Sequence, residues 1–301
     1  MREIPVFFID AFTDTLFKGN PAAVCVFDEK LTYEQMQGIA KEIGFSETCF
    51  VMAMQLGDRI EPLQSDSCED YTLQWFTPET EVNLCGHGTL ATAFVLWHLY
   101  ENTHSTINFH TKSGILPVYK EDDFIVLDFP LLPMVKSERI FPDLFESLGL
   151  SEFGDRRSPL QNSSGNLRFP ILYESEISRY LLIEITKEQL HNINIDFYRL
   201  QKIPIHPFTS IIITSHGDDD YDFYSRCFAV WEGIDEDPVT GSAHCVLASY
   251  WQSRYHEKSE FKAYQASARG GEIIINIKGD RVFLKGKATL FMKGKIFLEN
   301  A

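Results

Sequence analysis

The 301-residue sequence lacks any long uncharged apolar stretch, and no segment approaches the roughly 18 residues that a membrane-spanning helix requires. The apolar run 6–9 near the N-terminus is too short for a signal peptide. Basic residues are few: 27 Lys and Arg stand against 43 Asp and Glu, a formal net charge of -16. Such a charge repels nucleic acid and anionic lipid, so neither is expected as a partner. These absences predict a soluble, cytoplasmic protein.

The sequence also lacks paired cysteines. It contains no C-x-x-C pair and no zinc-ribbon spacing, although it has six cysteines in all: Cys25, Cys49, Cys68, Cys85, Cys227 and Cys245. In a chain of this size, scattered cysteines indicate reduced, mostly buried thiols in a reducing compartment. Hydrophobic residues make up 44% and charged residues 23%, which is typical of a globular chain long enough for two domains.

The first clear helix pattern lies at 33–43. Thr32 stands at the start of a capping-box spacing, apolar residues recur with helical period, and Gly44 is suited to end the helix. The following segment, 45–52, is predicted to form a short, buried strand. Glu47 lies within this apolar segment, which is unusual for a carboxylate.

Both halves of the sequence contain a polar loop, a glycine and then an almost entirely apolar segment, 90–100 in the first half and 243–251 in the second. A helix without a polar face is a central, buried one. Aligning Gly88 with Gly241 superimposes the two segments and predicts two copies of one unit, although so short a match also arises by chance.

Several further segments have strand patterns bounded by turn residues, and glycines at 279, 286 and 294 punctuate the last of them. The segment 130–133 is expected to be a crossover between the halves, the acidic run 217–222 a solvated loop, and 151–167 an exposed loop. The predicted strands are 6–9, 24–27, 71–76, 124–129, 179–185, 210–214, 272–277, 281–284 and 288–291.

The start of a buried helix is a natural site for a carboxylate. Its first N–H groups lack partners within the helix and the helix dipole adds partial positive charge, while glycine allows close approach. If the two units face each other, both helix starts meet at one cleft, a common place for a small molecule. The alternative is that Thr89 and Ser242 simply cap their own helices.

A carboxyl group that acts as acid and base on carbon needs a pKa raised toward neutrality. Burial of Glu47 would raise it, and a second carboxylate at Asp237 would raise it further. Each candidate also has a simpler interpretation. Glu47 is then a solvent-facing strand residue, Asp237 only holds its own loop, and His87 is a capping residue.

Five sequence blocks together resemble the PhzF (phenazine biosynthesis-like) family, and they follow the family order over nearly the whole chain. The long block around Asp-Pro-Val-Thr-Gly-Ser is the most specific. The five blocks are residues 19–24 (GNPAAV), 45–48 (FSET), 84–90 (LCGHGTL), 232–244 (EGIDEDPVTGSAH) and 265–271 (QASARGG).

The resemblance implies an α+β, diaminopimelate epimerase-like fold, with two pseudo-symmetric domains that each form a β-barrel around a central buried helix. We place these domains at 1–118 and 119–287, with a strand near 288–301 as a candidate to complete the first. It also implies a homodimeric isomerase that shuttles a proton on a small, cyclic or conjugated carboxylate substrate without metal or organic cofactor.

Site residues follow from the same resemblance. Glu47 is the expected acid/base, and the other expected catalytic residues are His87, Asp237 and Ser242. The residues expected to bind the substrate, chiefly its carboxylate, are Asn20, Gly86, Gly88, Thr240 and Gly241.

Cys85 departs from the better-studied branch of the family. A two-thiol racemase is excluded, because the position equivalent to Cys85 in the second half is Pro238. Cys85 is therefore interpreted as a buried remnant of the fold or, alternatively, as a second proton carrier opposite Glu47.

Three rival functions stay open. One is a catalytically silent binding module on the same fold. Another is a metalloenzyme that uses His87, His244, Asp237 and Cys85, although their spacing matches no known ligand motif. A cysteine hydrolase is disfavoured, because residues two apart in a glycine turn, such as Cys85 and His87, seldom meet as nucleophile and base.

The sequence does not identify the substrate. Aromatic residues near the motifs are candidates for the walls of the cleft and would favour a ring or a conjugated chain; they are Phe12, Trp75, Phe76, Phe228 and Trp231.

Overall fold

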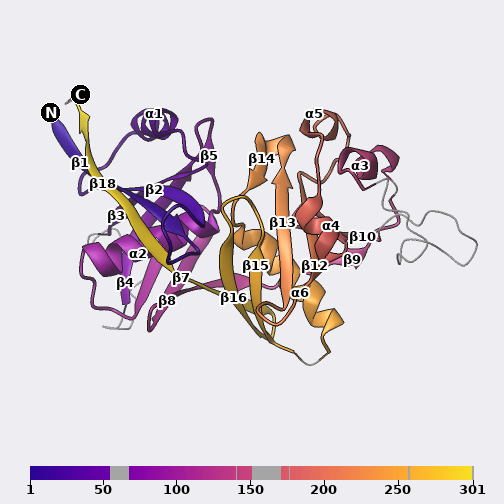
Figure 1. Ribbon diagram of the computed structural model, residues 1–301. Helices are drawn as coiled ribbons and strands as arrows, with labels where there is room; N and C mark the ends of the chain where they lie inside the picture. The colour runs from indigo at the N-terminus through magenta and orange to yellow at the C-terminus, as the bar shows by residue number, and fades with distance from the viewer. Residues whose placement is uncertain (55–67, 140, 151–170, 176, 257, 300–301) are drawn as a thin grey trace, which may run out of the picture. The chain divides into compact units, whose positions relative to one another are not determined.

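The structure is a computed structural model that describes residues 1–54, 68–139, 141–150, 171–175, 177–256 and 258–299 (Figure 1). It divides into two compact units. The first comprises Met1–Pro130 together with Gly271–Ala301, and the second comprises Leu131–Gly270. The crossover expected at 130–133 coincides with this boundary, whereas the loop expected at 151–167 lies outside the described residues.

The unit boundaries differ from the predicted domains 1–118 and 119–287. Residues 119–130 and 271–287 belong to the first unit, because their strands pair with each other and with the preceding strand. β8 (Phe124–Pro130) is antiparallel to β7 (Gly114–Glu121), and β17 (Arg281–Gly286) is antiparallel to β8. Hydrogen bonding between strands distant in sequence, which periodicity does not reveal, therefore sets the boundary.

As far as the structure describes it, the first unit is mostly antiparallel sheet with two helices. β18 runs through Gly294 along the full length of β1 instead of ending near 291. Glycine in mid-strand does not end a strand when both neighbouring segments pair. The other elements of this unit are β1 (Arg2–Ala11), β2 (Asn20–Val26), α1 (Tyr33–Ile43), β3 (Thr48–Ala53), β4 (Cys68–Phe76), β5 (Glu81–Val82), α2 (Gly86–Leu99), β6 (Thr106–Thr111), β16 (Gly271–Lys278) and β18 (Ala288–Leu298).

Helix α1 forms where the sequence predicts it. Thr32 and Gln35 make a complete capping box, and Gly44 ends the helix in the left-handed conformation with φ 72°. The strand predicted at 45–52 is shorter than expected and begins at Thr48. Glu47 therefore lies in the connection before β3 rather than within the strand.

Helix α2 is buried nearly all round, as its apolar sequence predicts. It packs against β1, β2, β3 and β8 of its own unit. The polar groups at its buried start, His87 and Thr89, must therefore find partners inside the protein.

In its described residues, the second unit combines a mixed sheet with four α-helices. β11 and β12 are parallel neighbours, and β12 is antiparallel to β13. Its elements are β9 (Val135–Lys136), α3 (Pro142–Ser147), β10 (Leu172–Ser175), β11 (Tyr180–Glu184), α4 (Lys187–Asn192), α5 (Phe197–Leu200), β12 (Ser210–His216), β13 (Phe223–Ala229), a 3-10 turn (Val230–Glu232), β14 (Ile234–Asp237), α6 (Gly241–Arg254) and β15 (Glu260–Gln265).

Helix α6 is the buried helix of the second unit, and Trp251 fixes it by donating a 3.1 Å hydrogen bond to the Thr214 hydroxyl of β12. When the two helices are aligned by their first residues, Gly86 corresponds to Gly241. The alignment predicted from sequence paired Gly88 with Gly241, a difference of two residues. Under the alignment by first residues the counterpart of Cys85 is Thr240, so the second unit still offers no thiol there. The fold is α+β, and barrels around central helices stay a prediction.

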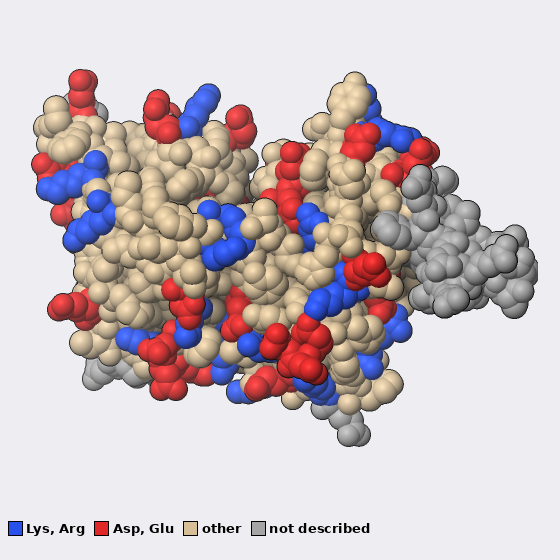
Figure 2. All heavy atoms as spheres, in the orientation of Figure 1, with Lys and Arg blue, Asp and Glu red and all other residues tan. Residues whose placement is uncertain are grey.

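Charged side chains are spread over the face seen in Figure 2, where acidic and basic groups alternate rather than forming one large patch of a single sign. No helix of the described residues is long and apolar enough to cross a membrane.

Candidate active site

Glu47 is placed by the parallel pairing of β2 and β3. Its carbonyl accepts a hydrogen bond from the N–H of Ala23, 3.4 Å away, and Ala23 is the register partner of Thr48. The same end of β2 carries Asn20, which is completely buried. The pairing therefore brings a carboxylate and a buried amide to one end of the sheet.

Helix α2 begins at this end of the sheet, and Cys85 is its N-cap. The Cys85 sulfur accepts a hydrogen bond from the N–H of Gly88 at 3.3 Å, and the Thr89 hydroxyl donates to the Cys85 carbonyl at 2.6 Å. The Gly88 N–H thus already has one partner, and its role in holding a substrate carboxylate stays a prediction. Cys85 also has a structural task, because its sulfur caps the start of the helix.

Gly88 is required by packing. A Cβ atom at this position would lie 2.7 Å from the sulfur of Cys49, 2.9 Å from the sulfur of Cys85 and 3.1 Å from the Trp75 ring. Glycine thus lets β3, β4 and the first turn of α2 pack closely together. Glycine at position 88 therefore has a steric reason, in addition to any functional one.

His87 links these groups. Its Nε2 lies 3.2 Å from a Glu47 carboxylate oxygen, its Nδ1 lies 3.2 Å from the Asn20 amide nitrogen, and the Cys85 sulfur lies 3.6 Å from Nδ1. Nε2 of the ring therefore faces the Glu47 carboxylate, and Nδ1 faces the Asn20 amide. The ring is only 5% exposed, so the contacts persist without competition from water.

The pKa of Glu47 is lowered, contrary to the expectation from sequence. Burial raises it, but the charge of His87, its hydrogen bond and a hydrogen bond from Ser46 together outweigh burial. The sequence indicated the burial but gave no distance to His87. Glu47 therefore rests as a carboxylate, the form required of a base.

The Cys85 sulfur lies 3.6 Å from Nδ1 of His87, although residues two apart in a glycine turn seldom form a nucleophile–base pair. The N-cap position directs the thiol back over the first turn of the helix, where His87 lies. One atom each from Glu47, Cys85 and His87 lie within 4.8 Å of one another, a set that could hold a metal such as zinc. This set differs from the predicted rival, which combined His87 and Cys85 with His244 and Asp237.

The second unit holds the other predicted residues at the start of α6. The Thr240 hydroxyl donates to the Asp237 carboxylate and so makes no capping hydrogen bond to its own helix. Buried Gln265 fixes this loop: its oxygen accepts from the Thr240 N–H at 2.8 Å, and its nitrogen donates to the Asp237 carbonyl at 2.7 Å. The role of Gln265 was missed from sequence, because its partners lie more than twenty residues away.

His244 is a structural residue of this unit. It is fully buried, its Nδ1–H donates to the Thr240 carbonyl at 2.7 Å, and burial lowers its pKa to about 4. The imidazole is therefore neutral at physiological pH. One of its nitrogens is committed to the backbone, which leaves little support for the predicted rival role as a metal ligand.

The aromatic residues proposed as walls are mostly core residues. Four of the five are no more than 1% exposed, because large apolar side chains gain most from burial; these are Phe12, Trp75, Phe76 and Phe228. Trp231 is half-buried and donates to the Ile203 carbonyl at 3.0 Å.

The predicted residues thus form two groups. Asn20, Glu47, Cys85 and His87 lie together in the first unit, and Asp237, Thr240, Gly241 and Ser242 lie together in the second. That the two groups act on one substrate stays a prediction.

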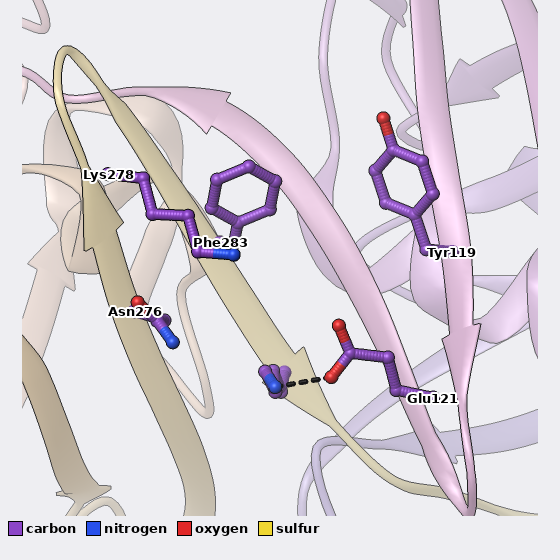
Figure 3. A pocket seen from close by; sticks show the side chains of 6 residues that line it. Tyr119, Glu121, Asn276, Lys278 and Phe283 are labelled. Carbon is purple, nitrogen blue, oxygen red and sulfur yellow. Dashed lines mark hydrogen bonds and ion pairs between the residues drawn. The ribbon is translucent and has the colours of Figure 1, made fainter.

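A separate surface pocket lies on β7, β16 and β17 of the first unit (Figure 3). Lys285 pairs there with Glu121, and Lys278 lies over the Phe283 ring. None of the predicted site residues lines it, so it is distinct from both groups.

Comparison with known structures first defines the class of fold. A PhzF-family phenazine biosynthesis protein of Enterococcus faecalis superimposes with a TM-score of 0.82 at 36% identity, over 99% of this chain and 100% of that one. A hydroxyproline epimerase from Agrobacterium vitis, solved with bound trans-4-hydroxy-L-proline, shares only the fold, with a TM-score of 0.57 at 10% identity over 99% of this chain and 94% of that one.

Sequence comparison then gives the family. The model of the phenazine biosynthesis-like protein family matches residues 9–294. An uncharacterised isomerase of Halalkalibacterium halodurans is 42% identical over 99% of this chain and 100% of its own length. The chain therefore belongs to the phenazine biosynthesis-like (PhzF) family, as its five sequence blocks predict.

Proposed function

We propose that this protein is a cofactor-independent isomerase that moves a proton on a small, conjugated or cyclic carboxylate, with Glu47 as the acid/base. The observation that carries the proposal is the contact of 3.2 Å between Glu47 and His87 at the buried start of α2. The isomerase named among its relatives supports this class of reaction.

The geometry supplies what such a reaction needs. Glu47 rests ionised and so is able to take a proton from carbon. His87 is held by Asn20 and keeps the carboxylate oriented. A bound substrate would displace the remaining water from Glu47 and raise its pKa, so that the proton can be returned to another atom of the conjugated system.

Replacement of Glu47 by Gln tests this proposal. The protein is incubated in D₂O with a panel of unsaturated carboxylic acids, and NMR follows the loss of C–H signals. The wild type is expected to exchange deuterium for a carbon-bound hydrogen in at least one acid. Glu47→Gln is expected to lower this exchange rate by a factor of about 10² or more, the usual contribution of a positioned acid/base.

Glu42→Gln is the matched control, because it removes an exposed carboxylate from the end of α1 and should leave the exchange rate unchanged. Thermal unfolding checks that both variants fold. Exchange at the wild-type rate in Glu47→Gln would rule out the assigned residue, and absence of exchange with every acid would favour a silent binding module.

The metal-binding alternative rests on the cluster of Glu47, Cys85 and His87. Under the proposed mechanism, prolonged treatment with a strong chelator should leave the exchange rate unchanged, as should added zinc at or below the protein concentration. A loss of exchange that zinc restores would make the protein a metalloenzyme instead.

The family resemblance also leads us to propose a cytoplasmic homodimer. Light scattering coupled to size exclusion would measure the mass, and a value for one chain of 34.6 kDa would contradict the dimer.

A further inference from the structure

Tyr180, the first residue of β11, makes a buried contact with a predicted site residue. Its hydroxyl lies 2.8 Å from the hydroxyl of Ser242, in the first turn of α6, and the side chain is only 9% exposed. We infer that Tyr180 is a positioning residue that makes Ser242 a hydrogen-bond donor to a carboxylate or enolate oxygen of the ligand. The inference deepens the proposed function and rests on it.

The first step is a count of hydrogens. A tyrosine and a serine hydroxyl carry one hydrogen each, and only one of them can lie between the two oxygens. Burial, followed by the neighbouring Cys227, raises the pKa of Tyr180 well above its ordinary value, so the phenol stays protonated. Within the described part of the chain, Ser242 is the only hydrogen-bond partner found for the phenol. A buried O–H that has one available acceptor donates to it.

The second step follows for Ser242. Because its oxygen receives the hydrogen of Tyr180, its own hydrogen is directed elsewhere. The neighbouring hydroxyl, that of Thr240, is already committed to the Asp237 carboxylate. Ser242 is therefore the hydroxyl of this helix start that retains a hydrogen for a ligand.

The third step gives the chemistry of the ligand. Thr240 provides no side-chain cap for α6, whose first N–H groups and dipole favour a negative charge. Donors from the backbone and from Ser242 together suit an atom that only accepts hydrogen bonds. A carboxylate or enolate oxygen is such an atom, whereas an ammonium group is not.

The experiment is a double-mutant cycle on the binding of benzoate, an anion that accepts hydrogen bonds. Benzylamine, a cation that donates them, is the second probe. Calorimetry measures both probes against wild type, Tyr180→Phe, Ser242→Ala and the double variant. We expect benzoate to bind and benzylamine not to. Each single variant should weaken benzoate binding about tenfold, and the double variant no more than Ser242→Ala alone, because Tyr180 acts through Ser242.

Tyr250→Phe is the matched control. It removes a buried phenol from α6, the helix that carries Ser242, but this phenol contacts Glu184 instead of Ser242. The substitution should therefore leave benzoate binding unchanged. The inference is overturned if the wild type does not bind benzoate or if Tyr180→Phe binds it like the wild type. It is also overturned if the effects of Tyr180→Phe and Ser242→Ala add in the double variant. Finally, it is overturned if Tyr250→Phe weakens benzoate binding as much as Tyr180→Phe does.

Failure of the proposed function is separate from these outcomes. It would appear as wild-type protein that binds benzoate with the expected cycle but exchanges no deuterium into any acid.

Discussion

At the scale of single residues, Glu47 depends on its neighbours more than on its burial. Burial alone would raise the pKa of the carboxyl group, and a partly desolvated position was the reason to single it out. His87 reverses this tendency from 3.2 Å away. The imidazole owes its own orientation to Asn20, so three side chains from β2, the β3 connection and α2 determine one protonation state.

Replacement of His87 by Gln should raise the pKa of Glu47, because the charge and hydrogen bond of His87 no longer oppose the effect of burial. Carbon-detected NMR of the Glu47 carboxyl would measure the shift, with Glu47→Gln identifying the resonance. His110→Gln is the matched control, since it removes another imidazole–carboxylate contact, the 2.8 Å pair with Asp70. An unchanged titration of Glu47 in His87→Gln would contradict the stated cause.

The same pair predicts a pH dependence of stability. A carboxyl group with a lowered pKa in the folded state stabilises the protein above its unfolded pKa, about 4.3, and this stabilisation is lost as the pH falls through the folded pKa. The difference in unfolding free energy between wild type and His87→Gln should therefore be largest above about pH 4.5 and shrink in more acidic solution.

At the scale of elements, the two buried helices begin in different ways. Helix α2 is capped by the thiol of Cys85, whereas the side chain at the equivalent position of α6, Thr240, is turned away to Asp237. Only the second helix start therefore keeps its amide groups free of a side-chain cap. The repeat in the sequence indicates two similar helices, but this difference depends on which neighbour each capping side chain contacts.

Gly88→Ala should destabilise the protein by about 1–3 kcal/mol, because the added methyl group would overlap two sulfur atoms and the Trp75 ring. Gly38→Ala is the matched control in α1: a Cβ there meets no atom within 4 Å, so the change should stabilise by roughly 0.5–1 kcal/mol. Denaturant unfolding measures both, and equal effects of the two substitutions would refute the packing argument.

At the scale of the whole molecule, the last strand completes the first unit. β18 pairs with β1 from Arg2↔Leu298 to Ala11↔Ala288, so the two ends of the chain lie side by side (Figure 1). Ile296 faces Ile4 and packs on the core that also contains Met36 and Phe50. The first unit therefore cannot be complete until β18 has been synthesised.

Ile296→Asp should cost about 2–3 kcal/mol, because it places a charge against this core. Phe297→Asp, one residue further on, alters a side chain that is 59% exposed and should change stability by no more than about 0.5 kcal/mol. Denaturant unfolding distinguishes the two. A larger loss of stability in Phe297→Asp than in Ile296→Asp would mean that the register of β18 is shifted by one residue, so that Phe297 and not Ile296 faces the core.

The sequence by itself determined the local features of this protein. The capping box of α1, the two apolar helices and the family blocks depend on residues close together in the chain, where spacing alone carries the information. Tertiary structure decided the boundaries of the units, the lowered pKa of Glu47, the burial of the aromatic residues expected as walls and the pairing of Tyr180 with Ser242. Each of these is set by distances between atoms from segments far apart in the chain, and such distances exist only once strands have paired and helices have packed.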